Sequence, residues 1–179
     1  MNDTPIPQPR LRTARLLLRP WRLEDAPMHR RLWEERDPRV PASRRIDAEG
    51  RPTLADLEDR IRRGPAGPGL GVLVLERREE GDPIGYCGLI RGGNAPPDAP
   101  ELAVELLADH HRRGYATEAG RAVVEHARAQ GHRRLYATVR DWNTASRRLL
   151  AGLGFVEDGT ADPDPVHGGS LLTILDLRG

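Results

Sequence analysis

Residues 101–118 read Glu-Leu-Ala-Val-Glu-Leu-Leu-Ala-Asp-His-His-Arg-Arg-Gly-Tyr-Ala-Thr-Glu, and this stretch decides the fold. Its first part alternates strictly, which predicts a β-strand over Glu101–Leu106. One face of that strand would carry Leu102, Val104 and Leu106, and the other face would carry Glu101 and Glu105. The periodicity then changes to that of an amphipathic helix over Thr117–Gln130, which Gly131 would end. The stretch therefore predicts a strand that leads through a short loop into a helix.

The loop between this strand and this helix has the composition of an anion site. Backbone N–H groups at the start of a helix have no intrahelical partner and can bind an anion. Gly114 removes a Cβ that would keep a ligand from the backbone, and Ala116 keeps the next turn small. Arg112 and Arg113 add positive charge. These features predict a pyrophosphate site, although the loop by itself also fits a tight turn with solvated arginines.

The rest of the chain predicts an α/β fold in which helices cover a mixed sheet. The predicted strands are Leu16–Trp21, Leu70–Leu75, Ile84–Ile90, Leu135–Val139 and Leu171–Leu177. The predicted helices are Leu23–Arg36, Leu54–Arg63 with Thr53 as its N-cap, and Asn143–Leu153. With a further strand near the C-terminus, the expected order is β-α-α-β-β-β-α-β-α-β-β.

Composition indicates a globular chain. Its 179 residues fit a single domain over residues 1–179, and residues 1–10 are polar and proline-rich and are expected to be flexible. No apolar run approaches the roughly 18 residues that cross a membrane, so we expect a cytoplasmic location and no membrane partner. The net charge of +1 argues against a nucleic-acid partner, although every basic residue is an arginine. Cys87 lies in an apolar run and is expected in the core.

Four stretches together resemble the GNAT superfamily of acyl-CoA-dependent N-acyltransferases. They are similar above all to its branch of ribosomal-protein N-terminal acetyltransferases. The stretches are Leu11–Pro20, Arg113–Ala119, Asn143–Ser146 and Leu153–Phe155. The family's cofactor loop commonly reads Gln or Arg, two residues, Gly, one residue, then Gly or Ala. Here His111 stands at the first position and Arg112 stands where glycine is frequent, but neither change removes a backbone donor.

The resemblance implies a mixed, mostly antiparallel sheet and direct transfer of an acetyl group from acetyl-CoA to a primary amine. It implies that the backbone of Val104, Glu105 and Leu106 binds the pantetheine arm and the thioester. It further implies a set of residues for the pyrophosphate and the cofactor: Arg112, Arg113, Gly114, Tyr115, Ala116, Thr117 and Asn143. Members of the family often form homodimers. The acceptor, a protein N-terminus or a small molecule, stays open, and a non-catalytic acyl-CoA-binding module is the competing function.

Transfer of an acetyl group to an amine needs a base for the amine proton. Glu105 is the predicted base, because the alternation of its strand points it away from the core and its backbone lies beside the expected thioester. Glu101, Asp162 and Asp164 are the alternatives.

The leaving thiolate needs a proton, and Ser146 is the predicted acid. The family's tyrosine acid corresponds to Leu150, which cannot donate a proton. The alternative role of Ser146 is that of a polar residue in the first turn of a helix. No metal is expected, because the adjacent pair His110 and His111 has no second pair of ligands at helical spacing.

Overall fold

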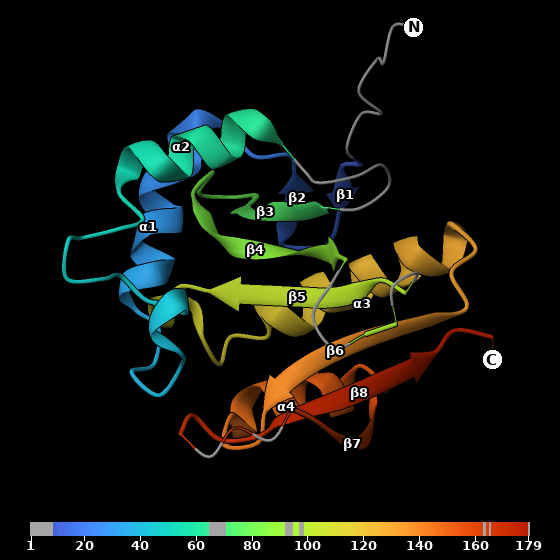
Figure 1. The fold of residues 1–179 in the computed structure, drawn as a ribbon. Helices are drawn as coiled ribbons and strands as arrows, with labels where there is room; N and C mark the ends of the chain where they lie inside the picture. The colour runs from blue at the N-terminus through green and yellow to red at the C-terminus, as the bar shows by residue number, and fades with distance from the viewer. Residues whose placement is uncertain are drawn as a thin grey trace, which may run out of the picture.

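The computed structural model describes residues 9–64, 71–91, 95–96, 99–162, 164 and 166–178. Its strands form one eight-stranded sheet in the order β1-β2-β3-β4-β5-β6-β8-β7 (Figure 1). Neighbouring strands run antiparallel except β5 and β6, which run parallel. The predicted fold class, a mixed and mostly antiparallel sheet flanked by helices, is confirmed. Residues 1–8 lie outside the described part, so the expected flexibility of residues 1–10 stays a prediction, as does the single domain.

The strands are β1 (Leu11–Arg12), β2 (Leu16–Arg19), β3 (Gly71–Arg77), β4 (Pro83–Ile90), β5 (Glu101–Leu106), β6 (Arg134–Arg140), β7 (Val156–Asp162) and β8 (Ser170–Asp176). The helices are α1 (Ala26–Glu34), α2 (Leu54–Arg63), α3 (Tyr115–Ala129) and α4 (Thr144–Gly152). Short 3-10 turns lie at Leu23–Asp25, Ala42–Arg44 and Ala108–His110.

The predicted elements are present, and some of their ends are shifted. α2 has the predicted bounds, because Thr53 and Asp56 close a capping box at its start. α3 begins earlier than predicted, because Gly114 adopts the left-handed conformation at its N-cap and frees Tyr115 to enter the helix. The edge strand β7 had no predicted range, since its sequence Val-Glu-Asp-Gly-Thr shows no alternation of apolar residues.

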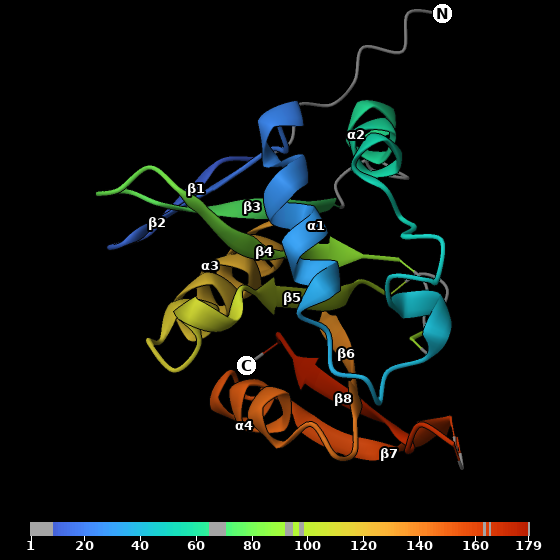
Figure 2. The ribbon, with the colours of Figure 1, turned by 90° about the vertical axis from the view of Figure 1, so that its left-hand side faces the viewer.

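The sheet separates two hydrophobic clusters. Figure 2 shows α3 and α4 on one side of the strands and α2 on the other. The main cluster joins the apolar stripe of α3 to the strands and contains Cys87, whose burial raises the pKa of its thiol to about 12. The smaller cluster lies under α1 and contains Met28, Leu32, Val74 and Leu107. The two clusters leave the strand edges between them to form the site.

A buried ion pair joins β2 to the start of α1. Arg19 donates to both carboxylate oxygens of Asp25, at 2.7 and 2.8 Å. The two residues are 3% and 2% exposed, and the guanidinium of Arg19 also donates to Glu76. Asp25 in addition accepts the backbone N–H of Arg22 at 2.7 Å. Removal of one partner would leave a buried charge without compensation, which is far more costly than loss of a surface pair.

We predict that Asp25→Ala lowers the free energy of unfolding by about 3–5 kcal/mol, the usual cost of breaking a buried pair from one side. Urea denaturation measures the loss. Asp37→Ala is the matched control, because it removes a carboxylate that is 35% exposed and whose ion pair among the described residues is with Arg39, and it should change the unfolding free energy far less. Equal losses in the two variants would contradict a structural role for the Arg19–Asp25 pair.

Candidate active site

The sheet opens between its two parallel strands. β5 and β6 are paired at one position only, Glu101 with Tyr136. The next step of a regular parallel ladder would use the N–H of Thr138, but that N–H donates to Oε1 of Glu101 at 2.9 Å. Glu101 is 6% exposed, and its other oxygen has no partner among the described residues. The Glu101 side chain thus replaces the ladder at the point where the strands part.

The backbone of β5 beyond this point has no ladder partner among the described residues on the β6 side, and we call the region between the two strands the gap. The Pro100 carbonyl accepts the N–H of Tyr136 at 3.0 Å, so it points toward β6. Backbone groups alternate sides along a strand, which means that those of Leu102, Val104 and Leu106 point the same way. The Leu106 carbonyl is taken by Nε2 of His111 at 2.8 Å. Polar groups of the Val104 backbone therefore have no strand partner in the described part of the β6 side, and their contact with the pantetheine arm stays a prediction.

The loop after β5 turns sharply into α3. Gly114 has a φ of 81° and is the N-cap residue of α3, and no side chain caps that end of the helix. The N–H groups of the first turn, which begins with Tyr115 and Ala116, therefore have no side-chain acceptor. An anion could bind them, and the helix dipole would favour it. Arg112, Arg113 and Thr117 belong to the same turn, as the sequence predicted.

Arg112 has a φ of 58°, in the left-handed region that non-glycine residues rarely adopt. This conformation typically costs an L-residue roughly 1–2 kcal/mol. It accounts for the frequent glycine at this position of the family motif. This chain has an arginine there, which adds a positive charge in the turn before α3.

An ion pair holds the loop against the β1–β2 turn. Glu118, in α3, accepts Thr13 Oγ1 at 2.6 Å and both the backbone N–H and Nε of Arg15 at 2.8 and 2.7 Å. Arg15 also donates to the carbonyl of Arg113 at 3.0 Å and lies 4.5 Å from the ring centroid of Tyr115. The position of the loop is thus set by residues about a hundred positions away in the sequence.

Glu105 lies on the face opposite Val104 and Leu106, as predicted, and it is bound on both oxygens. Arg36 donates Nε to Oε1 and Nη2 to Oε2, each at 2.7 Å. The Tyr86 hydroxyl, directly across the ladder, donates to Oε2 at 2.7 Å. Burial raises the pKa of the Glu105 carboxyl, but hydrogen bonds and charge from Arg36, with Tyr86 and Arg44, outweigh burial and hold it below its usual value. Glu105 is therefore ionised and fixed in orientation.

A cluster of aromatic rings, which we call the aromatic wall, lies beside Glu105 and was not predicted from the sequence. It consists of Trp21, His29, Trp33 and Tyr86. His29 lies 4.8 Å from Trp21 and 6.4 Å from Tyr86 between ring centroids, and Trp33 donates toward His29 at 3.4 Å. Burial, with the charge of Arg36, lowers the pKa of His29 to about 4, so the imidazole is neutral at neutral pH. His29, Trp33 and Arg36 stand at i, i+4 and i+7 of the predicted first helix. That spacing was the signal that could have placed them together.

Asn143 and Ser146, the remaining predicted site residues, lie at the start of α4. Asn143 is the N-cap of α4, and its side chain accepts the N–H of Ser146 at 3.1 Å. The Ser146 hydroxyl makes no hydrogen bond to other described residues, whereas Leu150 is buried in the main core. The capping role of Asn143 is thus present. Its cofactor contact and the acid role of Ser146 stay predictions.

The two aspartates proposed as alternative bases differ in the contacts that the structure describes for them. Asp164 holds Nδ1 of His167 at 2.9 Å and lies 3.5 Å from Arg140. Asp162 ends β7 rather than standing in a loop, and its side chain lies outside the described part. Within the described residues, no group of three or more His, Cys, Asp or Glu side chains could hold a metal ion.

The sequence matches the acetyltransferase (GNAT) domain family over residues 15–156, and the chain belongs to that family. It is similar to a solved GNAT-family acetyltransferase from Bordetella pertussis, with 25% identity, a TM-score of 0.73, and coverage of 93% of this chain and 99% of that chain. The family match, the parting of β5 from β6 and the uncapped start of α3 together identify the chain as an acyl-CoA-dependent acetyltransferase.

Two further solved structures share the fold but differ in their described acceptors. One from Vibrio cholerae, described as a ribosomal-protein-serine acetyltransferase, has 15% identity, a TM-score of 0.71, and coverage of 95% of this chain and 98% of that one. A mutant of spermidine N-acetyltransferase, also from Vibrio cholerae, has 16% identity, a TM-score of 0.72, and coverage of 92% and 95%. No curated protein matches the sequence significantly. Across the described helices, none has the length and apolarity to span a membrane.

We predict that Gly114→Val weakens acetyl-CoA binding by roughly tenfold or more, the loss expected when a hydrogen bond to a charged group fails. Calorimetric titration measures it. Gly131→Val is the matched control, because Gly131 has the same φ of 81° at the other end of α3 and an added Cβ there meets nothing within 4 Å. Both variants carry similar backbone strain, so an equal affinity in both would show that Gly114 does not adjoin the phosphates.

Proposed function

We propose that this acetyltransferase moves the acetyl group directly from acetyl-CoA to a primary amine at the gap between β5 and β6. The observation that carries the proposal is that the gap joins two different environments. At the C-terminal end of β5, the chain leads to the uncapped start of α3. One face of the same strand carries the ionised Glu105, which lies beside the aromatic wall. An anion and an amine could therefore approach the same strand from opposite sides.

In the proposed complex, the backbone of Val104 and Leu106 holds the pantetheine arm and the thioester, whereas the backbone of Glu105, which was expected to share this role, points toward its partner Tyr86 in β4. The pyrophosphate lies on Arg112, Arg113, Gly114, Tyr115, Ala116 and Thr117, and the side chain of Asn143 contacts the cofactor. The geometry supports this arrangement, since the gap leaves β5 backbone groups unpaired and the turn presents free N–H groups. No metal takes part in the proposal.

The amine nitrogen attacks the thioester carbonyl carbon, the new C–N bond forms, and the C–S bond breaks to release coenzyme A. Glu105 accepts the amine proton through a water molecule, because both of its oxygens are already hydrogen-bonded. Ser146 supplies a proton or a hydrogen bond to the departing thiolate. Glu101 is the second candidate base, since its Oε2 has no partner within the described residues.

The acceptor is proposed as a protein N-terminus or a small molecule that carries a primary amine. The first option follows from the resemblance to ribosomal-protein N-terminal acetyltransferases. We also propose a cytoplasmic location and a homodimer, which the resemblance suggests. A module that binds acyl-CoA without catalysis is the competing function.

Acetyl-CoA titration tests the proposal first. At roughly a hundredfold excess over Kd, we expect the melting temperature to rise by about 5–10 °C, because the ligand binds only the folded state. Release of free coenzyme A with a panel of N-terminal peptides, polyamines, amino acids and aminoglycosides then separates an enzyme from a binding module. Binding without release for every amine would favour the module, and no thermal shift would refute the assignment of the cofactor site.

We predict that Glu105→Gln lowers kcat by roughly 10²–10⁴ at neutral pH, the usual contribution of a general base, with partial recovery at high pH, where the free amine is abundant. Because its pKa is held down, Glu105 stays ionised to below the ordinary glutamate value of about 4.3. In the parent, activity should therefore fall toward low pH with the fraction of free amine, and a further acid limb from protonation of Glu105 should appear only beneath that pH. Arg36→Gln removes the main stabilising partner, and burial should then move the acid limb to higher pH.

Ser146→Ala serves as the comparison for this prediction. It should lower kcat more than it weakens acetyl-CoA binding, and it should leave the acid limb of the pH–rate profile in place. A Glu105→Gln profile that coincides with the profile of the parent would exclude Glu105 as the base and direct attention to Glu101.

A further inference from the structure

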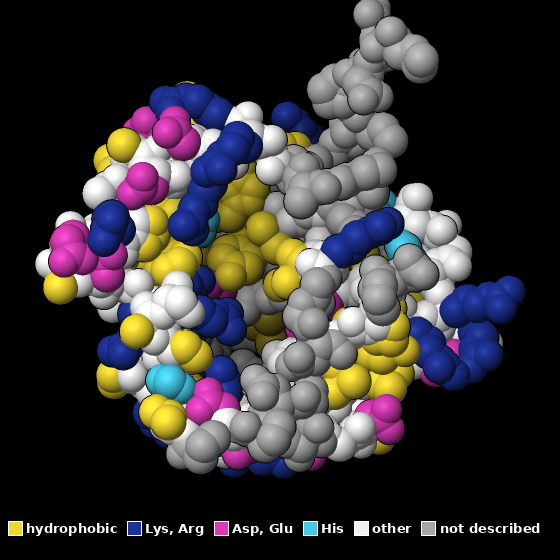
Figure 3. Space-filling model, viewed as in Figure 1, with side chains coloured by type: hydrophobic (Ala, Val, Ile, Leu, Met, Phe, Trp, Pro, Cys, Tyr) yellow, Lys and Arg dark blue, Asp and Glu magenta, His cyan; other side chains and the backbone are white. Residues whose placement is uncertain are grey.

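A cavity of about 420 Å³ opens beside the aromatic wall, between the end of α1, the 42–44 turn and α2. Figure 3 shows a hollow with a hydrophobic floor whose border carries basic side chains, all of which are arginine in this chain. The volume lies within the usual range of about 300–1,000 Å³ for sites of small ligands. Its position makes it a candidate for the acceptor site, and its charges bear on which acceptors fit.

Trp33 links the cavity to the residues that surround Glu105. Trp33 lines the cavity, and the guanidinium of Arg36 stacks on the Trp33 ring with its Cζ 4.1 Å from the ring centroid. Arg36 in turn holds Glu105 and donates to the Arg44 carbonyl at 3.0 Å. The chain of contacts from the cavity to β5 is therefore short, and an acceptor could extend from one to the other.

Each aspartate that lines the cavity already interacts with another residue of the chain. Its aspartates are Asp47, Asp56 and Asp59. Asp47 binds Arg51 at 2.9 Å, Asp56 closes the capping box with Thr53, and Asp59 binds Arg62 at 2.5 Å. Each of these carboxylates already makes at least one interaction, and Oδ1 of Asp56 and Oδ2 of Asp59 accept no hydrogen bond from a described residue.

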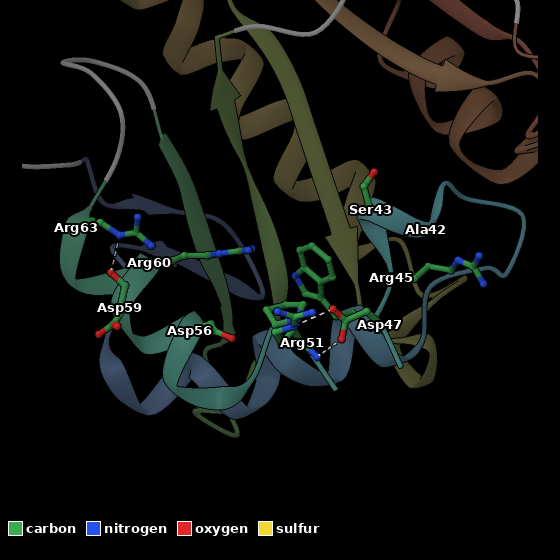
Figure 4. Close-up of a pocket in the computed structure, with 11 residues that line it drawn as sticks. Ala42, Ser43, Arg45, Asp47, Arg51, Asp56, Asp59, Arg60 and Arg63 are labelled. Atoms are coloured by element: carbon green, nitrogen blue, oxygen red, sulfur yellow. Dashed lines mark hydrogen bonds and ion pairs between the residues drawn. The ribbon is translucent and has the colours of Figure 1, made fainter. Parts of the chain in front are cut away.

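Arg60 lines the same cavity and differs from these aspartates in its lack of a charged partner within hydrogen-bond distance in the described part of the chain. It makes no hydrogen bond or ion pair to any carboxylate within the described residues, and its Cζ lies 5.3 Å from the centroid of Trp33. Figure 4 shows its side chain extended from α2 across the cavity, whereas Arg63 donates to the backbone carbonyl of Asp59 at 3.2 Å. Stacking on an aromatic ring holds a guanidinium in place and leaves its N–H donors open. Those donors have the fork geometry that binds carboxylate or phosphate.

We propose that Arg60 binds an anionic group of the acceptor, so that the preferred acceptors are amines that also carry a carboxylate or a phosphate. The inference rests on the proposed function, since it places the acceptor in this cavity with its amine toward Glu105. It disfavours polyamines, whose second ammonium group would meet the guanidinium of Arg60. Carboxylate and phosphate share the chemistry that Arg60 recognises, and the choice between them is left to the test.

The test uses amines of matched length. The probes are ω-amino acids with one to five methylene groups, together with the ω-aminoalkyl phosphates, the ω-amino amides and the α,ω-diamines of the same lengths. Release of coenzyme A from acetyl-CoA gives kcat and KM for each probe. We expect the best carboxylate or phosphate to exceed its amide and its diamine by at least roughly tenfold in kcat/KM, the effect of one hydrogen bond to a charged group.

Arg60→Gln should raise KM for the anionic probes by roughly ten- to a hundredfold and leave the amides nearly unchanged. Arg12→Gln is the matched control: Arg12 is an exposed arginine of β1 with no ion pair to a described residue. It should change neither preference nor KM. The preference of the parent enzyme tests the proposal even if Arg60→Gln is unstable.

The outcomes separate this inference from the proposed function. If acetyl-CoA binds and amides or diamines are acetylated as well as the anionic probes, the inference is wrong while the acetyltransferase stands. Acetyl-CoA binding with no turnover of any anionic probe also overturns it. If acetyl-CoA does not bind, both proposals fail together. A preference in the parent that Arg60→Gln and Arg12→Gln reduce equally would refute the assignment to Arg60.

Discussion

The single pairing between β5 and β6 is the constraint on which the site depends. Parallel strands normally continue their ladder, and here the ladder stops because the carboxylate of Glu101 takes the N–H of Thr138. The next backbone groups of β5 are thereby left without a strand partner. Unpaired backbone groups inside a protein are costly, so the gap is suited to a ligand that pairs with them. The same opening brings the start of α3 and the face that carries Glu105 to a common strand.

Arginine–carboxylate pairs fix both sides of this opening. On the α3 side, Glu118 and Arg15 hold the turn, and on the α1 side Arg36 holds Glu105 with two hydrogen bonds. A guanidinium binds a carboxylate in a planar, two-point geometry, which fixes orientation better than an ammonium group does. Such pairs contribute little net stability once desolvation is counted. Their effect here is geometric, since each sets the position of a group that would meet a substrate.

Local sequence patterns predicted most of the helices and strands, and they placed a turn between β5 and α3. The alternation of Glu101–Leu106 and the change of period after Gly114 predicted β5 and α3, and the turn between them was expected to be an anion site. The partners of Glu105 were not predicted. Tyr86 reaches it only through the β4–β5 register, and Arg36 reaches it from a helix placed by tertiary packing. Arg60 was missed for the same reason. Contacts between distant segments depend on register and packing, which a single sequence does not specify.

The state of Glu105 also restricts when it can act. An alkyl ammonium has a pKa near 10.4, about six units above an ordinary glutamate, so direct proton transfer from ammonium to carboxylate is uphill by roughly 8 kcal/mol. Arg36 and Tyr86 lower the pKa of Glu105 and increase that gap. The proton is thus better accepted after the nitrogen has attacked, when the bond to the carbonyl carbon has made the nitrogen far more acidic. A fixed, weakly basic carboxylate suits that later step. It cannot by itself deprotonate the incoming ammonium, so the residues around the site must favour binding of the neutral amine. The neutral His29 and the aromatic wall suit that requirement, because they add no charge beside Glu105.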